Sequence, residues 1–319
     1  MSSQKLSPST LVFLILPTLL WAGNAVVGRL IHDQIPPVTL NFLRWLIAFV
    51  VLLPFGASVL RPSSQMWKDW KRYAVLGLLG VGFYNAFQYL ALHSSTPINV
   101  TLVGSSLPIW TLLIGRLFFG SRMNRWQLLG ALVSLLGVLV ILLRGDFTQI
   151  TQVRFVAGDI YMIIATISWS LYGWVLASKK DSPDVARNWT TMLMAQVSLG
   201  LMLSAVFAGG EWLLTDWHIQ WDSGLLVALL YVALGPGIIA LCCWGIALKR
   251  VGPAKAGFFN NLVPLFAAAL SVLFLGDVPR LYHAASFVLI VGGIMLASHR
   301  VTPKANASST LCCDQSSRR

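Results

Sequence analysis

The chain has 319 residues, of which 56% are hydrophobic and only 11% are charged. A soluble domain carries about 25% charged residues, so this composition leaves too little polar surface for one. The formal net charge of +12 does not indicate nucleic acid binding, because the Lys and Arg residues fall in short loops between apolar runs instead of forming one basic face.

Ten apolar runs follow one another, each about as long as the roughly 20 residues that a helix needs to cross a bilayer. Backbone amides inside lipid must be paired within their own segment, and the runs lack the alternation of barrel strands. The predicted fold class is therefore an all-α integral membrane protein with ten transmembrane helices. The predicted spans are 11–31, 38–58, 73–92, 98–119, 126–143, 157–177, 190–208, 224–248, 254–275 and 282–298.

The positive charges predict the orientation of these helices, because short loops rich in Lys and Arg stay in the cytoplasm. If the N-terminus is inside, 17 of the 23 Lys and Arg residues are cytoplasmic, 4 are outside and 2 lie within spans. The outside residues are Arg29, Arg144, Arg154 and Arg280. We therefore predict that both termini are cytoplasmic.

The second half of the chain repeats the first. A shift of 156 positions aligns Pro97 with Pro253, Pro108 with Pro264 and Gly120 with Gly276, and no gap is needed between these pairs. An odd number of crossings per unit inverts the second copy, as in many secondary transporters. The predicted organisation is a cytoplasmic N-terminus (1–10), a first five-helix repeat (11–143), an inverted second repeat (157–298) and a cytoplasmic polar tail (299–319).

Three segments resemble a known family: "LLWAGNAVVGR" in the first span, "NFLRWLIAF" in the second and "NLVPLFAAALSVLFLGDVPRLYHAASFVLIVGGIMLAS" near the end. Together with the two five-helix halves, they resemble the EamA branch of the drug/metabolite transporter superfamily. The resemblance implies an inner-membrane carrier, and many members export amino acids or other small metabolites. One departure concerns the Leu-Gly-Glu that often ends the fourth and ninth helices, where this chain has Phe119-Gly120-Ser121 and Leu275-Gly276-Asp277.

The sequence predicts neither an enzyme nor a cofactor. It contains no phosphate-binding Gly-x-x-x-x-Gly-Lys-Ser/Thr loop and no His/Glu pair at metal spacing within one helix. The adjacent pairs Cys242/Cys243 and Cys312/Cys313 have the spacing of neither a zinc site nor a disulfide framework. The expected partners are a small-molecule substrate and the lipid bilayer.

Two arginines lie inside predicted spans, where an ionisable group is a functional candidate by default. Arg116 is close enough to a helix end to extend its side chain to the headgroups. Arg44 is deeper. It can clamp a substrate carboxylate, or it can bond structurally to carbonyls, Asn24 or Asn41.

No Asp or Glu falls in the middle of a span. The related small multidrug resistance proteins use a membrane carboxylate to bind either a proton or a cationic drug. Because that residue is missing here, a neutral, zwitterionic or anionic substrate is favoured over a lipophilic cation.

Substrate pockets are mostly apolar, with a few polar groups that fix orientation. The predicted substrate-binding residues are Trp21, Asn24, Arg44, Tyr84, Asn85, Gln88, Trp110, Trp169, Tyr172, Trp244, Asn260 and Asn261. Each aromatic side chain can instead pack against lipid or a neighbouring helix. Pro108 and Pro264 each remove a helix hydrogen bond, and we expect helix breaks there that expose carbonyls at related depths in the two halves.

Small residues in the fifth and tenth spans, among them Gly130, Gly137 and Gly293, allow close helix packing, either within one chain or in a homodimer. Taken together, the sequence predicts a secondary transporter, an exporter of small metabolites that works by alternating access. The alternative to a transport function is a membrane-embedded lipid-modifying enzyme or scaffold.

Overall fold

The computed structural model describes residues 7–31, 33–95, 97–152, 155–215, 218–275 and 280–298. Within these ranges every regular element is helical, so the predicted all-α fold class is confirmed. The polar tail with Cys312 and Cys313, as well as Gly276 and Asp277 after the ninth span, lie outside the described residues.

The helices follow the predicted spans in chain order. They are α1 (Pro8–Leu30); α2 (Pro37–Gly56); α3 (Trp70–Gly77), η3 (Leu78–Phe83) and α4 (Tyr84–Ser94); α5 (Pro97–Ser105) and α6 (Leu107–Phe118); α7 (Arg125–Leu142); α8 (Ala157–Ser178); α9 (Trp189–Leu214); α10 (Ser223–Val232), η5 (Ala233–Ile239) and α11 (Ala240–Val251); α12 (Pro253–Ala256), η6 (Gly257–Asn261) and α13 (Leu262–Leu275); and α14 (Leu281–Ser298). Short 3-10 helices connect them at η1 (Ala57–Leu60), η2 (Gln65–Trp67) and η4 (Phe147–Gln152).

Polar residues begin several of these apolar helices. Ser7, Asn188 and Asp222 accept hydrogen bonds from backbone amides in the first turns of α1, α9 and α10, and Asn124 with Gln127 forms a capping box on α7. Such caps satisfy amides that have no partner within the helix. Nine helical stretches of the described chain are long and apolar enough to cross a membrane. The remaining predicted span, the ninth (254–275), is divided among α12, η6 and α13.

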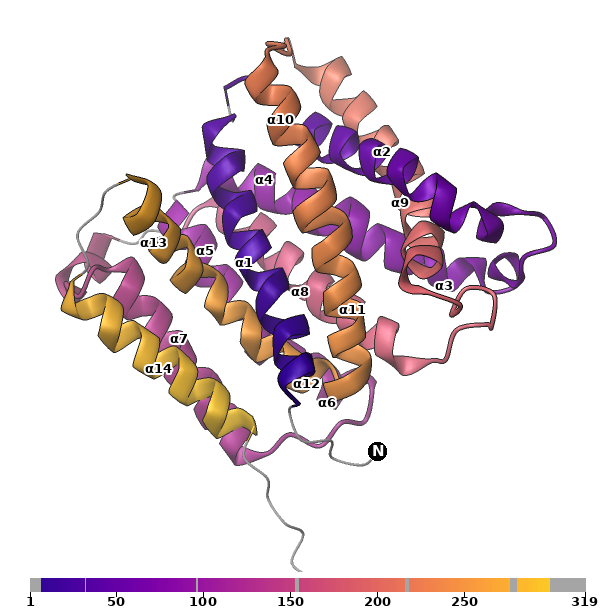
Figure 1. The fold of residues 1–319 in the computed structure, drawn as a ribbon. Helices are drawn as coiled ribbons and strands as arrows, with labels where there is room; N and C mark the ends of the chain where they lie inside the picture. The colour runs from indigo at the N-terminus through magenta and orange to yellow at the C-terminus, as the bar shows by residue number, and fades with distance from the viewer. Residues whose placement is uncertain are drawn as a thin grey trace, which may run out of the picture.

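The two halves pack in an interleaved way (Figure 1). In the first half α1 packs against α11 and α13, and in the second half its counterpart α8 packs against α4 and α6. The second and seventh spans, α2 and α9, contact each other across the halves. The start of α1 and the ends of α11 and α14 lie at the same lower side of Figure 1, as expected for spans that alternate in direction.

The fifth and tenth spans, α7 and α14, run side by side along one edge of the molecule (Figure 1). A Cβ on Gly130 would lie 2.5 Å from the carbonyl oxygen of Gly293, so only glycine permits this approach. Ser286 donates a hydrogen bond of 2.8 Å to the carbonyl of Gly137. The small residues predicted to allow close packing therefore join these two helices within one chain.

Four spans are interrupted, at matching places in the two halves. The third and eighth contain π-helical segments, η3 and η5, that begin 155 positions apart. The fourth and ninth break just before a proline: α6 begins at Leu107 ahead of Pro108, and α13 begins at Leu262 ahead of Pro264. Because helix interruptions leave carbonyls free to bond elsewhere, both halves present backbone groups toward the interior at related positions.

Candidate substrate site

Five of the predicted aromatic residues form one cluster between the two halves. Trp169 lies at its centre, with ring centroids 4.9 Å from Tyr84, 5.0 Å from Tyr172, 5.4 Å from Trp21 and 6.5 Å from Trp244. Trp21 and Trp244 also meet edge to face at 5.3 Å. These geometries are the ones aromatic rings prefer. We call these five residues the aromatic cluster; they come from α1, α4, α8 and α11.

Each π-helical segment supplies a carbonyl to a side chain of another span. The indole of Trp21 donates to the carbonyl of Pro236 in η5 at 3.3 Å, and the amide of Asn41 donates to the carbonyl of Val81 in η3 at 3.1 Å. Asn41 also donates to Ser204 of α9 at 3.1 Å. Hydropathy alone did not reveal these segments, although glycines gather in both of them, at Gly80, Gly82, Gly235 and Gly237.

Arg44 of α2 is buried, with 2% of its surface exposed. Its Nη1 donates to Oδ1 of Asn85 at 3.1 Å, whereas its Nε has no hydrogen-bond partner. No Asp or Glu among the described residues forms an ion pair with it. A guanidinium has five N–H donors, so most of its hydrogen-bonding capacity is unused.

The surroundings of Arg44 are polar and aromatic. Its guanidinium carbon lies 5.1 Å from the ring centroid of Trp45, and the phenols of Tyr84 and Tyr89 are close enough to interact with it electrostatically. The Tyr89 hydroxyl is buried without a hydrogen-bond partner. Since Tyr84 also contacts Trp169, it links the Arg44 guanidinium to the aromatic cluster.

The amide residues predicted for the site differ in their positions and hydrogen bonds. Asn85 is the partner of Arg44, and Asn24 is buried with an Oδ1 that has no partner. Gln88 is half-buried one turn after Tyr84. The structural bonds predicted for Arg44 with Asn24 or Asn41 are not formed; Asn85 takes that role.

Three predicted site residues lie apart from the aromatic cluster. The indole of Trp110 donates to Ser106 at 3.1 Å, beside the break between α5 and α6. Asn260 donates to the carbonyl of Gly257 at 3.3 Å within η6, and Asn261 donates to Ser134 of α7 at 2.9 Å. The last bond attaches the interrupted ninth span to α7.

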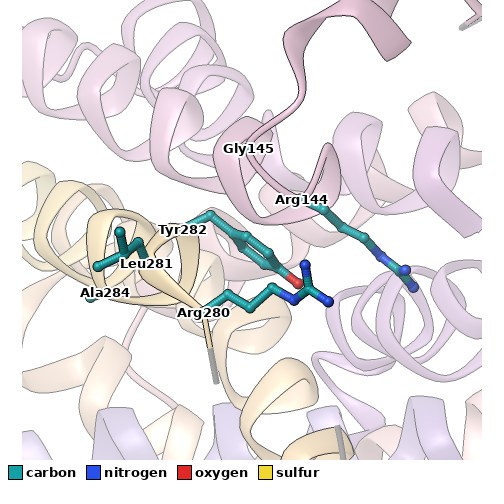
Figure 2. A pocket seen from close by; sticks show the side chains of 6 residues that line it. All are labelled: Arg144, Gly145, Arg280, Leu281, Tyr282 and Ala284. Carbon is teal, nitrogen blue, oxygen red and sulfur yellow. The ribbon is translucent and has the colours of Figure 1, made fainter. Parts of the chain in front are cut away.

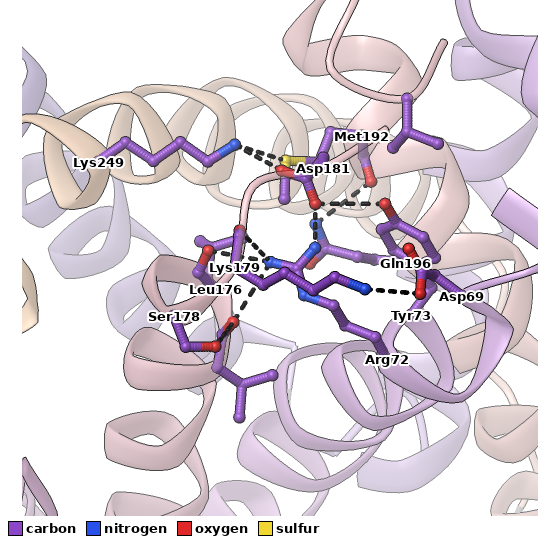
Figure 3. A network of polar contacts seen from close by, with 12 residues as sticks. Asp69, Arg72, Tyr73, Leu176, Ser178, Lys179, Asp181, Met192, Gln196 and Lys249 are labelled. Atoms are coloured by element: carbon purple, nitrogen blue, oxygen red, sulfur yellow. Dashed lines mark hydrogen bonds and ion pairs between the residues drawn. The ribbon is translucent and has the colours of Figure 1, made fainter. Parts of the chain in front are cut away.

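A buried ionic network that the sequence did not predict lies at the end of the molecule where α8 and α11 finish (Figure 3). The side chain of Asp181, in the loop between α8 and α9, is fully buried and pairs with Arg72 of α3 and, at 2.7 Å, with Lys249 of α11. Tyr73 donates to the same carboxylate at 3.2 Å. Lys179 pairs with Asp69 at 2.7 Å. Burial raises the pKa of Asp181, but the hydrogen bonds and charges of Lys249 and Arg72 outweigh it and hold the pKa below its usual value.

The profile of the EamA-like transporter family matches residues 8–143 and, a second time, residues 156–299. The chain belongs to the EamA-like transporter family. Its two matches cover nearly all the membrane helices, so this protein is a membrane transporter of small molecules with a two-repeat helical fold.

Relatives within the family are named as transporters. The chain is 27% identical over 260 residues to the uncharacterized transporter YyaM of Bacillus subtilis, covering 81% of this chain and 82% of that protein. It is 25% identical over 293 residues to a probable amino-acid metabolite efflux pump of Salmonella typhimurium, covering 88% and 92%. It is 26% identical over 288 residues to the aromatic amino acid exporter YddG of Ancylobacter novellus, covering 88% and 93%. A crystal structure of 24% sequence identity shares the fold, with a TM-score of 0.70 over 91% of this chain and 96% of that one.

Proposed function

We propose that this EamA-like transporter exports small metabolites that carry a carboxylate, of the amino-acid type, across a bacterial inner membrane. The observation that carries the proposal is the buried Arg44, which has one hydrogen bond and no carboxylate partner among the described residues. A charge inside a membrane is costly unless it is paired or hydrated. A substrate carboxylate would pair it through two parallel hydrogen bonds.

The aromatic cluster would receive the apolar part of the same substrate. Tyr84 contacts Trp169 and is close enough to Arg44 to interact with it electrostatically, so a molecule held by its carboxylate at Arg44 would extend toward the rings. Asn85 would keep the guanidinium oriented, and the free Oδ1 of Asn24 offers a hydrogen-bond acceptor for a substrate N–H group. This arrangement suits a zwitterion with an apolar side chain and disfavours a lipophilic cation, which Arg44 would repel.

Alternating access would separate the two halves around this site. Trp21 and Tyr84 belong to the first half, and Trp169, Tyr172 and Trp244 to the second. A movement of one half against the other would therefore open the aromatic cluster. The export direction is supported by the names of the Salmonella and Ancylobacter relatives.

Purified protein in liposomes tests the proposal. Vesicles that contain the protein and are loaded with labelled amino acids should release them faster than protein-free vesicles loaded in the same way. The released amino acids should be chemically unchanged. The same assay should discriminate between each amino acid and its carboxamide. Conversion of a lipid or solute in detergent, with no flux across vesicles, would instead favour the membrane enzyme that the sequence left open. Equal flux of acids and carboxamides would reject the carboxylate-specific site.

A further inference from the structure

An open pocket lies where α7 ends and α14 begins, away from the elements that form the aromatic cluster (Figure 2). The residues that line it are Arg144, Gly145, Arg280, Leu281, Tyr282 and Ala284. The pocket is therefore formed by the two helices that pack together at the edge of the molecule, at the end predicted to face outside.

Two guanidinium groups gather at this pocket. Arg144 and Arg280 are both exposed, and neither side chain forms a hydrogen bond or ion pair with another described residue. They are two of the only four Lys and Arg residues on the predicted outer side. On a side so poor in positive charge, two free arginines in one pocket form a local site for an anion.

Arg144 also has a backbone conformation that a side chain disfavours. Its φ is 51°, and it is the one non-glycine residue of the described chain with a positive φ. It follows the last turn of α7, a position where glycine is the common residue. Arg144 thus occupies a backbone conformation in which glycine would be less strained, and such positions are often associated with a functional side chain.

An apolar surface continues from the pocket along α14, one of the helices long and apolar enough to cross a membrane. Leu281 is 90% exposed, and Val288 and Met295 are 66% and 69% exposed. With Ala284, these residues are spaced by three, four and seven positions along α14 and so lie on one face of the helix. An anionic group bound at the pocket would thus stand at the head of a lipid-facing apolar track.

We propose that this pocket binds the phosphate of an anionic phospholipid, with an acyl chain along the exposed face of α14. Arg144 and Arg280 would bind the phosphate oxygens, and Tyr282 lies at the interfacial depth where aromatic side chains with a polar end are favoured. A soluble phosphate monoester carries the same chemistry, but the apolar track gives it nothing to contact. The proposal does not depend on the substrate proposed for Arg44.

Native mass spectrometry of the full chain tests this. Protein purified in mild detergent is mixed with phosphatidylglycerol or phosphatidylcholine, and the fraction retaining one lipid is measured with and without excess glycerol 3-phosphate. The test variant is Arg144→Gly with Arg280→Gln, because glycine relieves the strained backbone and keeps the fold. The control is Arg122→Gln with Arg187→Gln, which removes two exposed loop charges elsewhere.

We expect wild type and control to retain phosphatidylglycerol in preference to phosphatidylcholine. The test variant should bind phosphatidylglycerol at least about tenfold more weakly, which corresponds to the loss of one charge-assisted hydrogen bond. Glycerol 3-phosphate should not displace the lipid. Three results would each overturn the proposal: unchanged retention by the test variant, equal loss in the control, or displacement by glycerol 3-phosphate, which would assign the pocket to a soluble anion.

Discussion

Arg44 combines a high desolvation cost with few partners. Burying an unpaired charge in a membrane costs several kcal/mol, and the single bond to Asn85 offsets only part of that. The cation–π contact with Trp45 adds on the order of 1 to 2 kcal/mol. A bound carboxylate would supply the remainder, so the free protein holds a site whose filling is favourable.

Arg44→Lys tests this at the level of one side chain. The ammonium keeps the charge but cannot form the planar two-pronged contact, so affinity for carboxylate substrates should fall roughly tenfold to a hundredfold, on the order of 1.5 to 3 kcal/mol. Transport of the matching carboxamides should barely change. The measurement is concentration-dependent uptake into liposomes, normalised to folded protein, with Arg116→Lys as the control.

If Arg44 only supports the fold, the outcome differs in a recognisable way. The lysine variant would then lose folded protein, or lose transport of acids and carboxamides by the same factor. Either pattern removes Arg44 from the substrate site.

At the scale of helices, hydropathy located the spans but not their interruptions. The runs 98–119 and 254–275 read as continuous helices, yet the chain breaks at Ser106 and through η6. Pro108 and Pro264 marked these breaks because proline lacks the amide that a continuous helix requires. The π-helical segments η3 and η5 had no such marker, since an inserted residue changes neither length nor apolarity enough to be noticed.

The two prolines provide a test of these interruptions. Pro108→Ala and Pro264→Ala allow the fourth and ninth spans to become continuous, so we expect transport to slow several-fold while the amount of folded protein falls less. Pro54→Ala is a suitable control, because Pro54 lies inside α2 without a break. Initial transport rates and membrane protein levels are compared in the same cells. Unchanged rates in both test variants would assign the prolines to packing alone.

The ionic network around Asp181 shows why some polar contacts cannot be predicted from one sequence. Arg72, Asp181 and Lys249 are far apart along the chain, and each is an ordinary charge beside a span. Only the interleaving of α3, α8 and α11 brings them together. The aromatic residues of the site were easier to predict, because aromatic and amide side chains within spans are few and attract attention individually.

The network should make stability depend on pH. The pKa of Asp181 is lower in the folded protein than its unfolded value of 3.8. The stability that the Asp181 carboxylate provides is therefore fully present above pH 3.8, and it is lost as the pH falls through the folded-state pKa. At neutral pH, Asp181→Asn should destabilise the protein by on the order of 1 to 3 kcal/mol, below the range for fully buried pairs since Lys249 is partly exposed. Thermal unfolding in detergent at pH 7 and pH 3 measures this.

The difference between wild type and Asp181→Asn should shrink at pH 3, because the wild-type carboxyl is then losing its charge. Asp69→Asn serves as the control: its pair with Lys179 is more exposed, so its removal should cost less than about 1 kcal/mol. A difference between wild type and Asp181→Asn that stays constant with pH would show that the carboxylate charge does not stabilise the fold.

At the scale of the whole molecule, the internal repeat is expressed in packing as well as in sequence. The contacts of α1 with α11 and α13 have their counterpart in those of α8 with α4 and α6. The proposed alternating access requires such an exchange of partners, because one half would then move against the other while each helix keeps equivalent neighbours. The repeat was visible in the sequence through aligned prolines and glycines. Which helices of one half pack against which helices of the other could be seen only in the structure.

The positive charges predict how the molecule is oriented in the membrane. With 17 Lys and Arg residues on one side and 4 on the other, the loop asymmetry predicts that both termini and the Asp181 network face the cytoplasm. Reporter fusions after Thr302 and near Lys180 should be active as cytoplasmic reporters, and a fusion in the loop between α9 and α10 should report the outside. The three positions check each other, because the loop after α8 and the C-terminus are separated by four further spans and must lie on the same side. A C-terminal fusion that reports the outside, with the Lys180 fusion still inside, would require an odd number of crossings after α8. That result would contradict the two-by-five organisation on which the proposed alternating access depends.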